Sequence, residues 1–441
     1  MAVYLYLQLF VSFTTWVLFM IFNYIYNVIR RLYWRYTGVH QQVIANKKPE
    51  NYNRAAHVKK ILFRRIIEGY IKYPESSFLT VHEGFVNPER IMQDDCSLYA
   101  ITPTEAIFVQ VKNRPDELFL YDFLWMGQFL AADKLITIPL NHFNKLAEEM
   151  EDEGSKIIFL HNQARCGGTL VTALFKETGR CVCLNEPTCI STICNHIFVE
   201  YTWHGAKARR MFKNTIRMLC KPYSGLGKSV MAYVIKPLFL DILIIEMAQE
   251  VFPEAIQFFI YRDPIEIAIS IRRIGQLINT LKLLVYLPNI SSIIHIIGSV
   301  LGAQNKEYRG WTCVMHPEFE IGYRGATYTV FYYLEALKRG INIHGVRYED
   351  LITHEANIIK NIFQVCQCLD SFTEKAKAAM GKDSQANSSV SREKVRDALR
   401  NPVELPPGFM DVARAMSEEY GIPGPDVYQD KTFRLSNSLE P

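Results

Sequence analysis

Four short stretches of this chain carry residue types that can bind an anion. The first is QARCGG, residues 163–168, where Gly167 and Gly168 allow a tight turn after an apolar strand. Such a turn points successive backbone N–H groups inward, and the positive end of the following helix favours negative charge there. Arg165 adds a fixed positive charge, and Thr169 adds a hydroxyl in the first helical turn. The stretch predicts a phosphate-type anion site, although the Gly-Lys-Ser/Thr ending of a Walker A loop is absent.

A second stretch, YRDPIEIAIS, places an arginine at the end of an apolar strand and a serine inside the helix that follows. Asp263 and Pro264 suit the N-cap and the first position of that helix. Ser270 lies eight residues after Arg262, about two helical turns on, so its hydroxyl can face the same side as the guanidinium. An ordinary Arg–Asp pair at a helix start has the same pattern, and the spacing alone leaves both interpretations open.

Two further polar stretches follow later in the chain. VRYEDLI, residues 346–352, comes at a strand end, and KDSQANSSVSREK, residues 382–394, carries several hydroxyls between Lys382 and Arg392. Taken singly, the first is a strand stop before a capped helix, and the second is a polar loop before a helix. The position of VRYEDLI matters because ligands of parallel sheets bind at the carboxyl ends of the strands.

Regularly alternating elements position these stretches from residue 156 onward. The expected strands are apolar throughout, and helices separate them. Such strands indicate a parallel sheet that is covered by helices on both faces. The expected strands are residues 156–162, 181–185, 229–236, 256–262 and 340–348, and the expected helices include residues 169–177, 238–252 and 355–366.

In combination, the four stretches resemble the sulfotransferases that use 3′-phosphoadenosine 5′-phosphosulfate (PAPS), and most closely their membrane-bound, carbohydrate-directed branch. In that family a Lys/Arg-Ser-Gly-Thr/Ser-Thr loop holds the 5′-phosphosulfate. A strand-end arginine and a serine eight residues later hold the 3′-phosphate. RYEDL recurs at a later strand end, and LNEP, residues 184–187, resembles a Glu-Pro that follows the second strand. The resemblance covers roughly residues 156–400.

The resemblance implies a set of residues that bind the donor nucleotide. They belong to the glycine loop, the arginine–serine pair and a late loop that closes over the nucleotide, and they are Arg165, Cys166, Gly167, Gly168, Thr169, Leu170, Arg262, Ser270, Ser384 and Arg392. Two of them depart from the family's loop. Cys166 stands where the family has a serine, and Gly168 stands where it has a threonine or serine. Each change removes a hydroxyl donor, although backbone N–H groups can still hold an anion.

The implied reaction moves a sulfuryl group in line from PAPS to an acceptor hydroxyl or amine, without a metal. Arg165 would neutralise the leaving phosphate. Glu186 would accept the proton of the acceptor as a general base. The alternative for Glu186 is a helix-capping or salt-bridged carboxylate. Lys236 ends another strand, and it either faces the same pocket or extends its ammonium group to solvent.

The predicted fold is an α/β three-layer sandwich with a central parallel sheet, preceded by a transmembrane helix and a small α+β module. The expected boundaries are 1–35 for the anchor and its basic flank, 36–150 for a linker and the small module, 151–400 for the P-loop, sulfotransferase-like domain, 274–310 for an apolar helical insertion within it, and 401–441 for a tail. A helix is expected over residues 55–71, and short strands over residues 106–111 and 118–124.

The amino terminus predicts a single-pass membrane anchor. Residues 1–29 hold no charged side chain, and a bilayer span needs about 20 apolar residues. Arg30, Arg31 and Arg35 follow at once, which favours a cytosolic position for the bulk of the protein. Resemblance to Golgi enzymes implies instead an endomembrane location with the domain in the lumen. The sequence does not decide on which side of the membrane the domain lies.

Composition narrows the partners. The chain has 441 residues and a formal net charge of +4, which gives no case for nucleic acid. Its ten cysteines lack the paired C-x2-C spacing of a zinc site, so no metal is expected. The leading hypothesis is a membrane-anchored sulfotransferase that acts on a glycan, a lipid or a small alcohol. The alternatives are a protein that binds the nucleotide without catalysis and a scaffold with the same fold.

Overall fold

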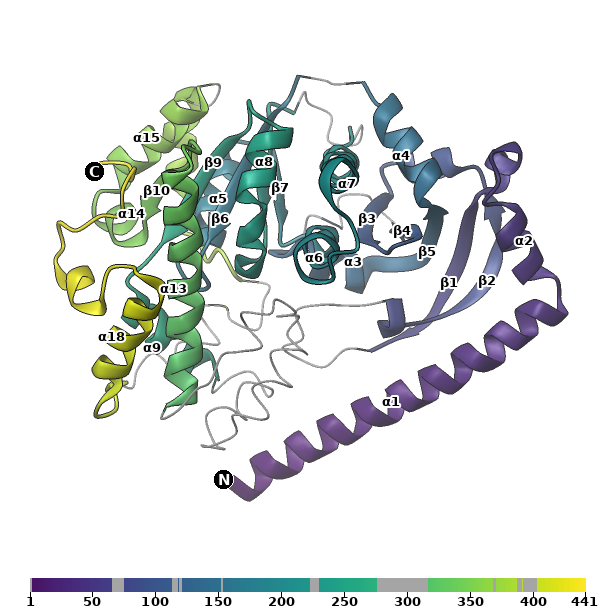
Figure 1. The fold of residues 1–441 in the computed structure, drawn as a ribbon, viewed down its shortest axis with the longest axis horizontal. Helices are drawn as coiled ribbons and strands as arrows, with labels where there is room; N and C mark the ends of the chain where they lie inside the picture. Colours follow the sequence, from purple (N-terminus) through teal and green to yellow (C-terminus); the bar gives the residue numbers. More distant parts are fainter. Residues whose placement is uncertain are drawn as a thin grey trace. The chain divides into compact units, whose positions relative to one another are not determined.

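The computed structural model describes residues 2–65, 75–112, 118, 121–151, 154–222, 230–275, 316–367, 370–386, 391 and 403–441. The chain divides into two compact units, each with its own sheet (Figure 1). The first unit is built mainly from residues 1–153 and 188–227, and the second from residues 154–187 and from residue 228 onward. The chain therefore leaves the second unit after that unit's second strand and returns before its third.

The first unit contains an antiparallel sheet of five strands in the order β2-β1-β5-β4-β3. Its strands are β1 (Ala56–Arg64), β2 (Phe78–Val86), β3 (Cys96–Ile101), β4 (Glu105–Val111) and β5 (Ala132–Pro139). Its α-helices are α1 (Ala2–Tyr36), α2 (Val39–Ala45), α3 (Leu124–Ala131), α4 (Leu140–Glu149), α6 (Thr188–Cys194) and α7 (Gly205–Leu219). Single turns lie at Pro49–Arg54, Glu75–Ser77, Pro88–Met92 and Asn195–Val199.

The helix predicted over residues 55–71 is wrong, because its first part forms strand β1. The apolar residues of this segment fit a helical face as well as a buried strand, and tertiary pairing decides between the two. Strand β1 pairs with β2 on one side and with β5 on the other. Its central Lys59 is buried and bonds Glu75 at 2.5 Å. The strand predicted over residues 106–111 is present as part of β4.

Helix α1 lies along the antiparallel sheet through aromatic and polar contacts. The Tyr26 hydroxyl donates to the Thr80 carbonyl at 3.0 Å, and Arg30 Nη1 donates to the Thr80 hydroxyl at 2.5 Å. The Trp34 ring packs against the His57 ring with centroids 5.1 Å apart. These contacts hold the carboxyl half of α1 against β1 and β2.

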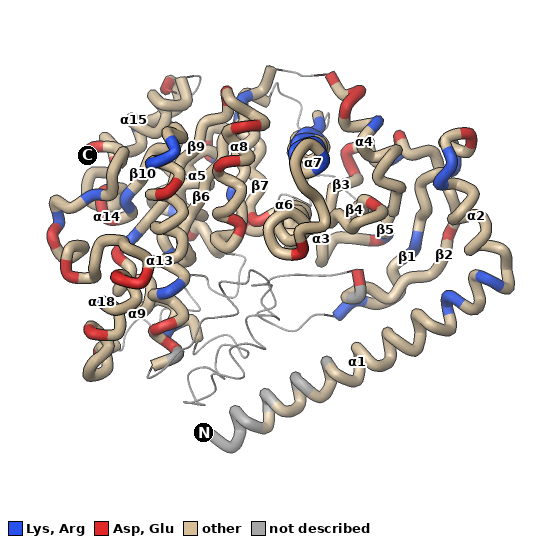
Figure 2. The backbone as a smooth tube through the Cα atoms, in the orientation of Figure 1, with Lys and Arg blue, Asp and Glu red and all other residues tan. Residues whose placement is uncertain are grey.

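The predicted transmembrane anchor is wrong. No helix in the part of the chain that the structure describes is both long and apolar enough to cross a membrane. Polar side chains interrupt the apolar run of α1, and Asn27 donates to Asn23 at 3.1 Å within it. The charged residues of α1 gather at its carboxyl end (Figure 2). The single-pass membrane localisation that depended on this anchor is corrected with it.

The second unit contains the parallel sheet that the sequence predicts. Its five strands follow the order β10-β9-β6-β8-β7, and every neighbouring pair is parallel. The chain adds β7 and β8 on one side of β6, and then β9 and β10 on the other. The carboxyl ends of β6 and β9 therefore flank the topological switch point, where ligands of open α/β sheets bind. The strands are β6 (Lys156–Asn162), β7 (Cys181–Asn185), β8 (Ala232–Lys236), β9 (Ile256–Tyr261) and β10 (His344–Arg347).

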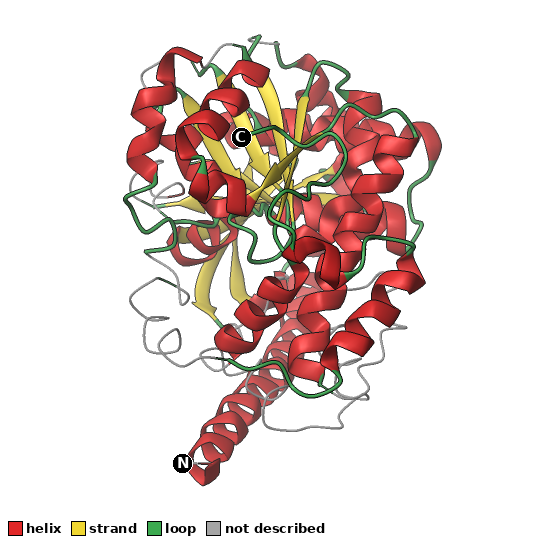
Figure 3. Ribbon diagram, turned by 90° about the vertical axis from the view of Figure 1, so that its left-hand side faces the viewer, coloured by secondary structure: helices red, strands yellow, loops and turns green. Residues whose placement is uncertain are grey.

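Helices cover both faces of this sheet (Figures 1 and 3). Alternate residues of β9 point to opposite faces. Ile260 packs with side chains of α5 and α15, whereas Phe259 packs with side chains of α8 and α13. The α-helices are α5 (Gly168–Glu177), α8 (Ile245–Val251), α9 (Pro264–Gly275), α13 (Pro317–Lys338), α14 (Tyr348–Thr353), α15 (Glu355–Cys366), α16 (Thr373–Ala376) and α18 (Phe409–Tyr420). Short 3-10 turns lie at Phe239–Ile244, Asp370–Phe372, Lys377–Ala379 and Pro425–Gln429.

The carboxyl-terminal segment packs on the outer edge of β10. The Gly345 N–H donates to the Asn437 carbonyl at 2.9 Å, and the Leu439 N–H donates to the Gly345 carbonyl at 2.8 Å. Arg434 forms two hydrogen bonds with the Asp350 carboxylate at 2.8 and 3.0 Å. The segment therefore pairs with an edge strand and is tied to the helix that follows it.

Two sequence predictions lie outside the described residues. One is the apolar insertion at residues 274–310, of which only 274 and 275 are described, as the end of α9. The other is Arg392 in the late loop. Of the strand predicted over residues 118–124, residues 119 and 120 also lie outside the described part of the chain, residues 121–123 are irregular, and Leu124 begins α3.

Candidate functional site

The loop between β6 and α5 is shaped to present backbone N–H groups. Arg165 and Gly167 both have positive φ, at 61° and 85°, and Gly167 directly precedes the first residue of α5. A Cβ at Gly167 would lie 2.5 Å from the Tyr348 ring. Only glycine fits this position, because it tolerates both the backbone conformation and the close ring. The turn thus leads directly into the amino end of α5, the part of a helix that favours negative charge.

Arg165 joins three segments that lie far apart in the sequence. Its Nε donates to the Ser270 hydroxyl on α9 at 3.3 Å, and its Nη1 donates to Gln385 Oε1 in the late loop at 3.0 Å. Burial, followed by the charge of Arg262, lowers the pKa of Arg165 to about 10. The guanidinium stays protonated at neutral pH. The loop, the predicted serine and the late loop thus meet at one fixed positive charge.

Arg262, at the end of β9, faces the same region. Its guanidinium lies over the Tyr348 ring, 4.9 Å from the centroid, a favourable cation–π geometry. Its Nη2 donates to Glu266 at 3.0 Å, and its Nε lies 3.9 Å from a Glu349 carboxylate oxygen. That Nε is buried, and among the described residues it has no hydrogen-bond partner. Two carboxylates, those of Glu266 and Glu349, therefore flank this guanidinium.

Glu186 and Lys236 form an ion pair at neighbouring strand ends. Glu186 follows β7, Lys236 ends β8, and Lys236 Nζ donates to Glu186 Oε1 at 2.6 Å. The Lys236 side chain is 3% exposed and that of Glu186 is 18% exposed. The Glu186 N–H also donates to the Lys236 carbonyl at 2.6 Å. The carboxylate is therefore held in place, and it is the more accessible member of the pair.

Cys166 is buried inside the loop between β6 and α5. Its side chain is fully buried, and its Sγ donates to the Gln163 carbonyl at 3.0 Å. Burial raises the pKa of its thiol to about 11, so the reactive thiolate is absent at neutral pH. Cys166 contributes packing and loop shape rather than a nucleophile.

Several of the predicted site residues meet around Arg165. Its side chain bonds Ser270, and the charges of Arg262 and Glu186 act on it. Gly167 and Gly168 shape the turn beside it, where Cys166 is buried. Leu170 is buried in the core under α5, whereas Thr169 and Ser384 are half-buried. Sequence reasoning missed residues whose role depends on contacts across the fold, namely Gln163, Tyr348, Glu349 and Gln385. Tyr348 and Glu349 belong to the RYEDL motif, but the sequence spacing does not predict their contacts with Arg262.

Asp263 is an N-cap carboxyl in an unfavourable electrostatic setting. Its Oδ1 accepts from the Ile265 N–H at 2.8 Å. Burial, followed by the charges of Glu349 and Glu266, raises its pKa from 3.8 to about 6, against the opposing effects of that hydrogen bond and of Arg262. The folded state therefore favours the neutral acid. The contribution of the neutral Asp263 carboxyl to the free energy of unfolding is fully present below about pH 4, and it is lost as pH rises through about 6.

Asp263→Asn is accordingly expected to stabilise the protein at pH 7.5. Asparagine keeps the cap and removes the buried charge, a gain of at most about 3 kcal/mol. Thermal unfolding of the full chain across pH 4–8 measures the effect, and the gain should disappear near pH 4. Asp263→Ala is the control, because it removes the same charge together with the cap, so its stability should follow the same pH dependence as that of Asp263→Asn but lie about 1 kcal/mol lower at every pH. A gain that does not depend on pH would contradict the explanation.

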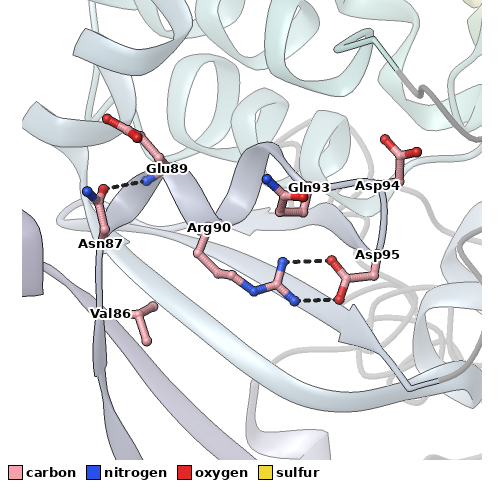
Figure 4. Close-up of a pocket in the computed structure, with 7 residues that line it drawn as sticks. All are labelled: Val86, Asn87, Glu89, Arg90, Gln93, Asp94 and Asp95. Carbon is pink, nitrogen blue, oxygen red and sulfur yellow. Dashed lines mark hydrogen bonds and ion pairs between the residues drawn. The ribbon is translucent and has the colours of Figure 1, made fainter.

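A polar surface pocket of about 710 Å³ lies in the first unit (Figure 4). Its lining residues are Val86, Asn87, Glu89, Arg90, Gln93, Asp94 and Asp95. Arg90 pairs with the Asp95 carboxylate, and the Glu89 N–H donates to Asn87 at 2.9 Å. None of the residues predicted from the sequence lies in this pocket. The strand ends of the second unit remain the candidate site.

The candidate site belongs to a mixed α/β unit that has a parallel sheet and a glycine turn after its central strand. Comparison with known proteins finds no matching family model and no matching curated protein. Among solved structures, the chain is similar to the sulfotransferase STF9 from Mycobacterium avium, with a TM-score of 0.32 and 12% identity, covering 59% of this chain and 80% of that one. It is also similar to a sulfotransferase from Alicyclobacillus acidocaldarius, with a TM-score of 0.31 and 11% identity, covering 62% of this chain and 93% of that one. Likenesses with TM-scores this low do not establish a function for this chain.

Proposed function

We propose that this chain is a sulfotransferase that moves a sulfuryl group from PAPS to a hydroxyl or amine of an acceptor. The observation that carries the proposal is the position of Arg165. It lies between the glycine turn, Ser270 and the late loop, beside the strand ends where ligands of such sheets bind. A nucleotide with phosphates at its 5′ and 3′ positions matches the two positive centres, Arg165 and Arg262.

The proposed chemistry requires a proton acceptor and a stabilised leaving group. The acceptor oxygen forms a bond to sulfur while the bond from sulfur to the phosphate oxygen breaks, and the departing phosphate keeps the electron pair. Glu186 takes the acceptor's proton, and Arg165 and the loop N–H groups stabilise the charge that grows on the phosphate. Lys236 holds Glu186 in place through the 2.6 Å ion pair. The acceptor class is a glycan, a lipid or a small alcohol.

A second candidate function is nucleotide binding without turnover. It is favoured by Cys166, whose thiol bonds the Gln163 carbonyl and so leaves the loop without the family's serine hydroxyl. Both candidates require the nucleotide site, and they differ in whether labelled sulfate from PAPS reaches an acceptor.

Calorimetric titration with 3′-phosphoadenosine 5′-phosphate (PAP) tests the shared site. We expect micromolar binding by the full chain and a loss of about 10–100-fold in Arg262→Ala, since hydrogen bonds to charged groups contribute about 1.5–3 kcal/mol. Arg339→Ala is the control, because that guanidinium is 59% exposed and pairs with Glu246 on the surface. A folded wild-type protein that binds no PAP would overturn both candidates. Equal losses in the two variants would overturn the role of Arg262.

A further inference from the structure

Gln163 occupies a buried position between the two positive centres of the site. It follows β6 directly and is 2% exposed. Its Oε1 accepts from the backbone N–H of Arg262 at 2.7 Å. Its Nε2 donates to the Ala326 carbonyl of α13 at 3.1 Å. One side chain thus ties the start of the glycine loop to the end of β9 and to a helix on the sheet.

The orientation of the Gln163 amide is fixed by its partners. A backbone N–H can only donate and a backbone carbonyl can only accept, so a rotated amide would lose both bonds. Backbone bonds hold the residue as well. The Gln163 N–H donates to the Ile260 carbonyl at 3.1 Å, and the Gln163 carbonyl accepts from Cys166 Sγ at 3.0 Å. The side chain therefore has one well-defined arrangement.

The loop and Arg262 stand on different strands, and their separation decides which ligands can use both. The anion-binding N–H groups belong to the turn after β6, and the guanidinium belongs to the residue after β9. Strand pairing between β6 and β9 ends at Asn162 and Ile260. Beyond that point, Gln163 supplies both the backbone bond to Ile260 and the side-chain bond to Arg262. It continues the connection between the two strands into the site.

We propose that Gln163 is a positioning residue that sets the distance between the two anion-binding centres. On the proposed function, on which this inference rests, the centres receive the 5′ and 3′ phosphates of one nucleotide. A bisphosphate gains from occupying both centres at once, and that gain depends on their separation. The affinity of either centre for a single phosphate does not depend on small changes in the distance between the two centres. Gln163 therefore controls selectivity for the bisphosphate over either monophosphate.

The test compares three probes, PAP, adenosine 5′-monophosphate and adenosine 3′-monophosphate, by calorimetric titration of the full chain. The wild type is expected to bind PAP at least about 100-fold more tightly than either monophosphate. Gln163→Met removes both side-chain bonds and keeps the volume, and should weaken PAP binding at least about tenfold. Binding of each monophosphate should stay within about threefold of the wild type. Gln163→Asn, too short to reach both backbone groups, should behave in the same way and replaces Gln163→Met if that variant fails to fold.

Gln257→Met is the matched control. Gln257 is also buried, and it joins strands and helices of the same sheet through His161 at 2.9 Å and the Ile245 carbonyl at 3.4 Å. It lies near the amino end of β9, away from the strand ends that form the site. A general loss of sheet stability would lower the unfolding temperature of both variants. Only the Gln163 variants should change the ratio of PAP to monophosphate affinity.

The outcomes separate the two proposals. Wild-type protein without PAP binding would overturn the proposed function itself. Wild-type protein that prefers PAP, with the preference unchanged in the Gln163 variants, would overturn only the role of Gln163. Parallel losses for all three probes would assign Gln163 a purely structural role and also contradict the inference. A selective loss for PAP supports it.

Discussion

Replacing Glu186 with glutamine is expected to lower the rate of sulfuryl transfer from PAPS by about 10²–10⁴-fold, the usual contribution of a positioned general base. PAP binding should remain within about twofold of the wild type. Glutamine keeps the size and the carbonyl oxygen of the glutamate, but it cannot accept the acceptor's proton at neutral pH. The Glu186 side chain is 18% exposed, so an acceptor can reach it.

The measurement is the release of PAP from PAPS in the presence of a mixed set of glycan, phenol and alcohol acceptors. Glu246→Gln serves as control, because Glu246 is 49% exposed and pairs with Arg339 on the surface. Full activity in Glu186→Gln would show that Glu186 is only the partner of Lys236. Absence of activity in the wild type, together with PAP binding, would favour the binding protein over the enzyme.

Lys236→Met is expected to destabilise the parallel-sheet unit by about 3–5 kcal/mol, because it leaves the Glu186 carboxylate without its buried partner. The Lys236 side chain is 3% exposed, and its ammonium group contacts the carboxylate at 2.6 Å. Removing both charges should cost less than the sum of the single changes, so Lys236→Met combined with Glu186→Leu should recover part of the loss.

Urea unfolding of the full chain, with hydrogen exchange of the β7 and β8 amides, measures this effect. Hydrogen exchange shows whether the loss of stability falls on the parallel-sheet unit, because a chain with two units need not unfold in one step. Lys338→Met is a suitable control, because its ammonium group is 69% exposed and pairs with Glu335 at 2.7 Å. If the free-energy changes of the two single variants add up to the change in the double variant, the ion pair contributes no coupling energy.

The parallel sheet and its strand ends could be predicted because their signals are local. Apolar runs such as residues 156–162 and 256–262 show the strands, and a charged residue such as Arg262 shows where a run ends. The spacing from Arg262 to Ser270 is likewise a local signal, because helical geometry is regular. These features need no knowledge of what packs against them.

The rest depends on contacts between distant residues. Gln163 is an unremarkable polar residue in the sequence, and it gains its role only when Ala326 and Arg262 lie beside it. Strand β1 carries a pattern that a helix could share, and its pairing with β2 and β5 decides the outcome. In α1, counting charges overstated the apolar character, since uncharged polar residues such as Asn23 also weaken a membrane span.

The pairing of the carboxyl-terminal segment with β10 has a consequence for synthesis on the ribosome. Strand β10 is the edge of the parallel sheet, and its outer side is covered by Asn437 and Leu439 through bonds to Gly345. An uncovered edge strand is a template for pairing with another chain. Because Asn437 and Leu439 are synthesised after β10, the nascent sheet keeps an open edge until they have left the exit tunnel. These residues then close the edge against neighbouring nascent chains.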